Sequence, residues 1–375
     1  MKKLSTVILL VWIGTTAIGQ ALSGPPDGNN QKSKVSQWIG PVEVSITYHS
    51  PNVHGTSGVD RKGHIWGELV PYGFIDQGLG AKPAPWRAGA NENTVITFSQ
   101  DVKISGKDLK AGAYGLFLVT DKDGPWTWIF STNSSSWGSF SYNSSEDALR
   151  VTATPEDAPY TEWLTYGFDS RKPNSTVAYL QWENKRINLP IEVPDVNAIY
   201  VSLNRKELRN TQGFDYRNYA AAAQFCADHK INLEEALTWA DASMSPATGG
   251  TEDFLTLTTK AAVLSAMGRE AEADAITDKA IKLPGAPVMG IHQYGKRLLA
   301  AGKKEKAFEI FQYNFKTHPE EKFITYVGLA RGYTAMGDKK NAIKNWEIAI
   351  KNAPDNQKPF LHVYEDELKK LKEEK

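Results

Sequence analysis

Val-Glu-Val-Ser-Ile-Thr-Tyr, residues 42–48, is the stretch that decides the fold of the first half of this chain. Apolar residues alternate with polar ones, so one face of the extended chain carries Val42, Val44, Ile46 and Tyr48. A period of two is typical of a strand with one buried face. The stretch therefore predicts a half-buried β-strand.

Short patterns of the same kind recur along the next 150 or so residues, with turn-forming Gly, Pro, Asn and Asp between them. The expected strands are residues 94–98, 102–105, 114–119, 126–130, 149–154, 163–168, 176–182 and 186–191. No helical pattern separates them, which favours antiparallel pairing. We therefore expect an antiparallel all-β domain, a sandwich or barrel-like fold, over residues 35–195.

The second half has a different period. Gly268, Gly302 and Gly337 recur at intervals of 34 and 35 residues. Each is followed by a small residue and then by a proline, in the order Ala273 and Pro284, Ala307 and Pro319, Ala342 and Pro354. This is the tetratricopeptide signature, in which small residues let paired helices approach and Gly and Pro end them. We expect an all-α tetratricopeptide-type helical solenoid over residues 205–375, joined to the β domain by a hinge at 196–204.

An earlier, degenerate helix pair is expected at 214–228 and 233–240, and residues 360–372 are expected to form a capping helix. Repeat arrays commonly present a concave surface to a protein. The repeats therefore predict an unidentified protein partner. The alternative is that the array only packs on the β domain as a rigid handle.

The N-terminus has the pattern of an export signal. Lys2 and Lys3 precede an apolar run over residues 4–18, and Gly19 ends a small-x-small cleavage site. We expect a signal peptide over residues 1–19, a flexible polar leader over 20–34, and a periplasmic or secreted mature protein. No second run of 18 apolar residues follows, so no integral membrane segment is expected in the mature chain.

The balance of acidic and basic residues, together with the absence of known site motifs, argues against several classes of function. The chain of 375 residues has 43 basic and 43 acidic residues and no concentrated basic stretch, which argues against nucleic-acid binding. His54 and His64, with Asp60 between them, match no metal template, so no metal site is expected. No cofactor motif is present, since Gly78 and Gly80 precede no helix.

Several motifs of the β region occur together in a fixed order. They are Ile65-Trp66-Gly67-Glu68 with Pro71-Tyr72-Gly73, Trp86-Arg87-Ala88-Gly89-Ala90-Asn91-Glu92, Ala113-Tyr114-Gly115, Trp137-Gly138, Asp147-Ala148-Leu149 and Glu162-Trp163-Leu164. In this the region resembles the exported bacterial family known as domain of unknown function 2911. The resemblance implies a β domain in an exported protein of Gram-negative bacteria, and it implies no activity.

Residues 86–94, Trp-Arg-Ala-Gly-Ala-Asn-Glu-Asn-Thr, place an indole, a guanidinium, a carboxylate and carboxamides at the start of a strand. We expect a small-ligand or partner site there, and the candidate binding residues are Trp86, Arg87, Asn91, Glu92, Tyr48, Trp66, Tyr72 and Trp137.

Two alternatives stay open for the same stretch. In the first it is a structural knot, in which Arg87 pairs with Glu92 and the asparagines cap the turn. In the second the chain is an envelope hydrolase or lyase that uses Glu92 with Arg87 and His64 for proton transfer. The sequence favours a non-enzymatic exported binding and scaffold protein.

Overall fold

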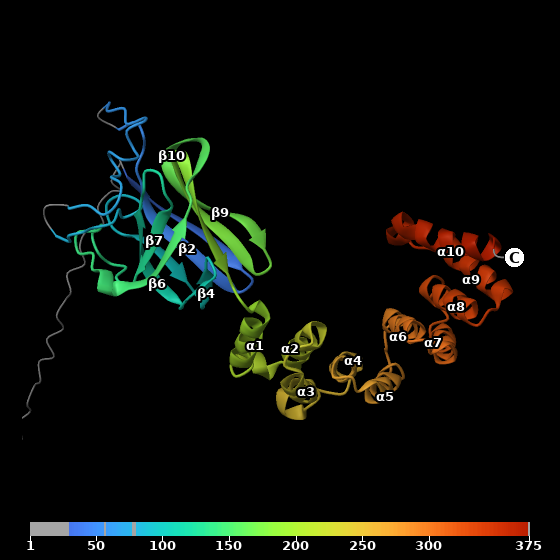
Figure 1. The fold of residues 1–375 in the computed structure, drawn as a ribbon. Helices are drawn as coiled ribbons and strands as arrows, with labels where there is room; N and C mark the ends of the chain where they lie inside the picture. Colours follow the sequence, from blue (N-terminus) through green and yellow to red (C-terminus); the bar gives the residue numbers. More distant parts are fainter. Residues whose placement is uncertain (1–29, 56–57, 77–79, 374–375) are drawn as a thin grey trace, which may run out of the picture. The chain divides into compact units, whose positions relative to one another are not determined.

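The computed structural model describes residues 30–55, 58–76 and 80–373, so the predicted signal peptide and most of the predicted leader lie outside the described residues. The chain forms two compact units that divide between Val196 and Asn197, a β unit and then a helical unit (Figure 1).

Two antiparallel sheets make up the β unit. The first has the order β1-β2-β3-β6-β7-β8, with β1 Gln31–Ile39, β2 Val42–Ser50, β3 Thr94–Phe98, β6 Gly112–Val119, β7 Trp126–Ser131 and β8 Asp147–Ala153. The second has the order β5-β4-β10-β9, with β4 Val102–Ile104, β5 Lys107–Leu109, β9 Glu156–Lys172 and β10 Ser175–Glu192. Neither sheet closes on itself within the described residues. The predicted antiparallel β domain is confirmed, and it is not a closed barrel.

The apolar face predicted for β2 is confirmed, but the strand is not half-buried, because Ser45 and His49 on its other face are buried as well. Val42, Val44 and Ile46 are fully buried and Tyr48 is nearly so. The strand lies between β1 and β3 in the sheet, which satisfies its backbone on both sides. The two sheets are connected through the core, where Trp128 of β7 donates a hydrogen bond to the Asn188 carbonyl oxygen of β10, 3.3 Å away.

Two predicted boundaries in the β unit are wrong. Residues 31–34 of the predicted leader belong to β1, in register with β2 from Gln31 opposite Ser50 to Lys34 opposite Thr47. The predicted strands 176–182 and 186–191 form the single strand β10. The interruption between them is a β-bulge at Glu183, which has φ 51° and a buried side chain.

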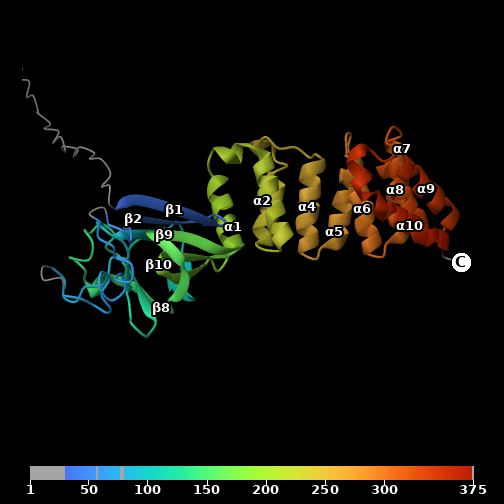
Figure 2. The ribbon, with the colours of Figure 1, turned by 90° about the horizontal axis from the view of Figure 1, so that it is seen from above.

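In the described part of the helical unit, four helix pairs follow one another, with one helix before them and one after. Figure 2 shows the helices in this succession along the unit. The pairs are α2 Tyr216–His229 with α3 Leu233–Ala242, α4 Phe254–Ala266 with α5 Glu270–Ala280, α6 Val288–Ala300 with α7 Lys304–Thr317, and α8 Ile324–Ala335 with α9 Lys339–Lys351. The flanking helices are α1 Val196–Glu207 and α10 Leu361–Glu373. The prediction of a hinge at 196–204 is therefore wrong, because those residues lie in helix α1.

The predicted repeat chemistry is confirmed residue by residue. Gly268, Gly302 and Gly337 each follow the first helix of a pair and have φ between 76° and 78°, the left-handed cap that glycine adopts without strain. The equivalent small residues Ala273, Ala307 and Ala342 are fully buried. At Gly295 a Cβ would overlap the Phe311 ring, so the contact between α6 and α7 requires a glycine.

The capping helix is confirmed as well. Leu371 of α10 is buried, and the ring of Tyr364 lies 5.5 Å from Phe323 and 5.9 Å from Trp346 between centroids. In the part of the chain that the structure describes, no helix is both long and apolar enough to cross a bilayer.

Candidate functional site

The backbone of the stretch 86–94 is held by hydrogen bonds to β6 and β9 and by one bond within the stretch. Trp86 exchanges two hydrogen bonds with Leu118 of β6, at 3.1 and 2.8 Å. The carbonyl oxygen of Ala88 accepts hydrogen bonds from the Thr94 hydroxyl at 3.1 Å and from the buried Tyr166 hydroxyl of β9 at 2.9 Å. The loop is therefore a built element of the β unit, and its side chains are held in place.

A pocket of about 340 Å³ opens beside this stretch. Three of the predicted residues line it, Trp86, Arg87 and Asn91. An apolar wall is formed by residues 69–71, Gly73 and Ile75. Arg61 and Trp182 also line the pocket. The volume is that of a site for a small molecule. We call it the Arg87 pocket.

Arg87 has an unusual environment. Its Nη1 donates to the Asn91 carbonyl oxygen at 2.6 Å, and its Cζ lies 5.6 Å from the Phe140 ring centroid. The guanidinium touches Gly138, where a Cβ would overlap it. Burial lowers the pKa of Arg87 from its usual value. Among the described residues no carboxylate lies within ion-pair distance, so a half-buried cation lacks its usual partner.

A second guanidinium lines the same pocket. Arg61 is partly buried and makes no side-chain hydrogen bond or ion pair with any residue in the described ranges. The described lining contains no aspartate or glutamate. The charge of the Arg87 pocket is therefore positive.

Four indole rings form the floor and its support. Trp66 lies 5.9 Å from Trp86, 4.8 Å from Trp126 and 6.1 Å from Trp182, between ring centroids. Trp86 and Trp182 are nearly parallel, with 18° between their planes and 6.3 Å between their centroids. The Nε1 donors of Trp66 and Trp182 are buried and have no hydrogen-bond acceptor in the described chain. The cluster fixes the rings that face the pocket.

The other predicted binding residues do not line the pocket. Tyr48 is buried against Tyr166, with 4.8 Å between ring centroids, and is a core residue. Trp66 is behind the pocket as part of the indole cluster. Tyr72 covers Gly67, and Trp137 is 60% exposed. The ligand-site assignment for these four therefore stays a prediction.

The predicted pair between Arg87 and Glu92 is wrong. Glu92 Oε2 lies 2.9 Å from Nε2 of His49, a buried residue of β2. His64 contacts Glu68, with 2.9 Å between Nδ1 and Oε1, and both are well exposed. The structure thus brings neither Glu92 nor His64 into the lining that contains Arg87.

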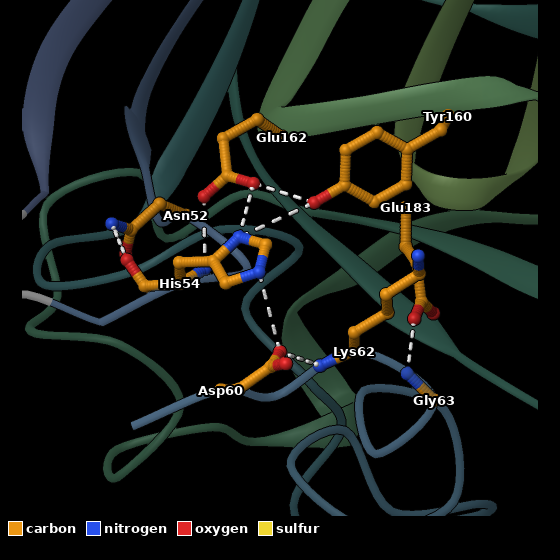
Figure 3. A network of polar contacts seen from close by, with 8 residues as sticks. All are labelled: Asn52, His54, Asp60, Lys62, Gly63, Tyr160, Glu162 and Glu183. Atoms are coloured by element: carbon orange, nitrogen blue, oxygen red, sulfur yellow. Dashed lines mark hydrogen bonds and ion pairs between the residues drawn. The ribbon is translucent and has the colours of Figure 1, made fainter. Parts of the chain in front are cut away.

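A polar network that the sequence did not reveal holds the neighbouring loop (Figure 3). Glu162 of β9 accepts from the His54 backbone N–H at 2.8 Å and from the Tyr160 hydroxyl at 2.5 Å, and it lies 2.7 Å from His54 Nδ1. His54 Nε2 is 3.4 Å from Asp60, which accepts from the Lys62 N–H. Glu183 accepts from the Gly63 N–H. The network ties residues 52–55 and 58–63, which include Arg61, to β9 and β10.

The pKa values in this network follow from its contacts. The hydrogen bond to Glu162 raises the pKa of His54 above its usual value. Burial opposes the ionised form of Glu162, but hydrogen bonds from Tyr160 and His54 outweigh it and lower the pKa to about 2. The network is a charge-assisted anchor. The only sequence signal for it was Glu162 within the Glu-Trp-Leu motif.

The described residues contain no cluster of three or more His, Cys, Asp and Glu that could hold a metal ion. His54 and His64, considered above for a metal, have separate carboxylate partners, Glu162 with Asp60 and Glu68.

Residues 30–191 match the family described as protein of unknown function (DUF2911). The β unit is a DUF2911 domain. The match covers β1 to the last residues of β10 and therefore includes every described residue of the Arg87 pocket. No curated protein matches the chain.

Solved structures resemble part of the chain. MamA from residue 41 onward, from Desulfovibrio magneticus RS-1, is 21% identical over 42% of this chain and 89% of its own, with a TM-score of 0.30. A tetratricopeptide repeat protein from Parabacteroides merdae ATCC 43184 is 15% identical over 47% of this chain and 66% of its own, with a TM-score of 0.35. With scores this low, the repeat assignment rests on the helix pairs and their glycine caps.

Proposed function

We propose that this protein is an exported binding protein, whose DUF2911 domain holds a small ligand in the Arg87 pocket and whose repeats hold a protein. The observation that carries the first part is Arg87 itself. A half-buried guanidinium costs free energy unless an acceptor compensates it. In the described chain its one hydrogen bond goes to a backbone carbonyl, and it lines a pocket of ligand size.

The geometry supports binding better than proton-transfer chemistry. A hydrolase or lyase that uses Glu92, Arg87 and His64 needs these groups in one cleft. Glu92 instead contacts His49, His64 contacts Glu68, and only Arg87 lines the pocket.

Two features support the protein-binding part. Paired helices with small residues at their contacts form an extended surface along the repeats. Leu255 and Met289 occupy equivalent positions near the starts of α4 and α6, and they are 47% and 46% exposed. We propose that these two side chains contribute to the surface that docks a protein.

Export is supported by the sequence of the first 19 residues, with two lysines, an apolar run and a small-residue cleavage site.

The ligand pocket can be tested by filling it. Ala90 lines the Arg87 pocket, and Ala111 is an exposed turn residue of the same unit. The Tm of three full-length proteins is measured with and without each member of a panel of neutral, anionic and cationic small molecules. The proteins are wild type, Ala90→Trp and Ala111→Trp. We expect compounds that raise the Tm of the wild type and of Ala111→Trp but leave Ala90→Trp unchanged. Equal shifts in all three proteins, or none, would contradict the proposed pocket.

A further inference from the structure

We propose that the Arg87 pocket takes a small carboxylate that carries a ring, with the carboxylate on Arg87 and Arg61 and the ring against Trp86 and Trp182. This inference rests on the proposed ligand-binding function and names the chemical class of the ligand.

The charge of the pocket selects an anion. The two charged residues of the described lining are both arginines, and neither has an ion-pair partner in the described chain. A guanidinium presents a planar set of donors that matches a carboxylate in a two-point contact. One Nη1 hydrogen bond to the Asn91 carbonyl and the contacts with Phe140 and Gly138 fix the Arg87 plane before any ligand arrives.

The lining lacks one element that commonly binds phosphate. Proteins often hold a phosphate at the N-terminus of a helix. The described lining consists of strand and loop residues of the β unit, and none of them begins an α-helix. The arginine side chains are its strongest donors.

The aromatic part selects a ring. Trp86 and Trp182 both line the pocket, and their indole rings are stacked, with 18° between the ring planes and 6.3 Å between the centroids. Residues 69–71 and Ile75 face the same space. Trp182 is 1% exposed, and its Nε1 has no acceptor among the described residues, so the lining contains a buried polar group without a partner.

The test uses pairs of probes that share a ring and differ in charge. Glucuronate is compared with glucose, and benzoate with benzamide, while acetate serves as a carboxylate without a ring. Affinities for the full-length protein are measured by calorimetry and by quenching of tryptophan fluorescence. We expect at least one ring-bearing carboxylate to bind about tenfold or more tightly than both its neutral counterpart and acetate.

The variants assign the contacts. Arg87→Gln is expected to weaken binding of that carboxylate by about tenfold to a hundredfold, the effect of losing a charge-assisted hydrogen bond. Arg61→Gln should weaken it less, and Arg87→Lys should weaken it although the charge is kept. Arg171→Gln removes an exposed arginine of the same unit and should leave affinity unchanged. Thermal melts of each variant without probe confirm that it is folded.

The outcomes separate the two proposals. If the neutral probes bind as well as the carboxylates, and Ala90→Trp abolishes binding, the pocket binds ligands but the inferred class is wrong. If Arg87→Gln leaves the carboxylate affinity unchanged, or neither ring-bearing carboxylate binds, the inference is overturned. If, in addition, no compound of the broader panel depends on Ala90, the proposed ligand-binding function fails too.

Discussion

Gly138 touches the guanidinium of Arg87 so closely that the loop admits no side chain at this position. Its φ of 60° also lies in the left-handed region, where other residues are strained. The position of the Arg87 guanidinium is thus constrained by a backbone 51 residues away along the chain. Sequence reasoning could list Trp137-Gly138 as a motif, but it could not show what the glycine touches.

Substitution at Gly138 should therefore act on both stability and binding. We expect Gly138→Ala to lower the free energy of unfolding by about 2 to 3 kcal/mol, through backbone strain and displacement of Arg87. Gly106→Ala is the matched control, because Gly106 has φ 81° and open space around its missing Cβ. It should cost about 1 kcal/mol from strain alone. Equal losses in urea unfolding would contradict the close contact with Arg87.

The contact between His54 and Glu162 should make stability depend on pH. The pKa of His54 is raised above 6.5 in the folded protein, so its contribution is complete below pH 6.5 and is lost as the pH rises through the folded value. The pKa of Glu162 falls from 4.5 to about 2, so its contribution is present above pH 4.5 and is lost toward pH 2.

Together, the raised pKa of His54 and the lowered pKa of Glu162 predict that the pair stabilises the folded protein most between pH 4.5 and 6.5. Urea midpoints of wild type and His54→Gln are compared at pH 5.5 and pH 8. The wild type should lose more stability than the variant between these values, and parallel changes would show that the pair contributes nothing. His229→Gln, on a helix of the other unit, is the control.

At the scale of elements, α5 meets α6 and α7 largely through polar side chains. Asp278 of α5 accepts from the hydroxyl of Tyr294 in α6 at 2.9 Å and lies 2.9 Å from Lys306 of α7. Asp274 pairs with Lys303, and Arg297 donates to Thr277 at 3.1 Å. The buried Tyr294 depends on one carboxylate, because its hydroxyl has no other acceptor in the described chain.

Asp278→Ala should therefore destabilise the helical unit. Removing the acceptor of a buried hydroxyl costs about 1 to 3 kcal/mol. Asp355→Ala breaks the exposed pair with Lys358 and should change the free energy of unfolding by about 0.5 kcal/mol or less. Unfolding followed by helical circular dichroism measures both, and equal effects would contradict a special role for Asp278.

The elements also show how far the sequence could predict the fold. The period of two in β2 follows from burial of one face, and the 34- to 35-residue spacing of the glycines follows from the left-handed cap that ends the first helix of each pair, so both could be predicted from the sequence. Strand β1 was missed because it lies at the edge of its sheet and residues 31–34 are largely exposed, so its sequence is polar like a leader. Glu92 was paired with Arg87 because they are near in sequence, whereas β2 brings His49 to it from 43 residues away.

The site was predictable only where its residues are contiguous. Trp86, Arg87 and Asn91 belong to one dense stretch and do line a pocket. Arg61 and Trp182 reach it from a loop and a distant strand, and neither has a local pattern that indicates binding.

At the scale of the whole molecule, export makes a direct prediction. If the first 19 residues are a signal peptide, the mature chain begins at Gln20. Mass spectrometry of the protein isolated from its native cells should find that N-terminus outside the inner membrane. A chain that keeps Met1 and stays in the cytoplasm would contradict export.

The central claim is that the DUF2911 domain carries a ligand on Arg87, and the most direct measurement looks for that ligand. Three full-length proteins, wild type, Arg87→Gln and Arg171→Gln, are purified from the native host and denatured. The small molecules that each protein releases are then compared by mass spectrometry. We predict a carboxylate released in a stoichiometric amount by wild type and by Arg171→Gln, and lost with Arg87→Gln. The same released molecules from all three proteins, or none from any, would contradict the claim.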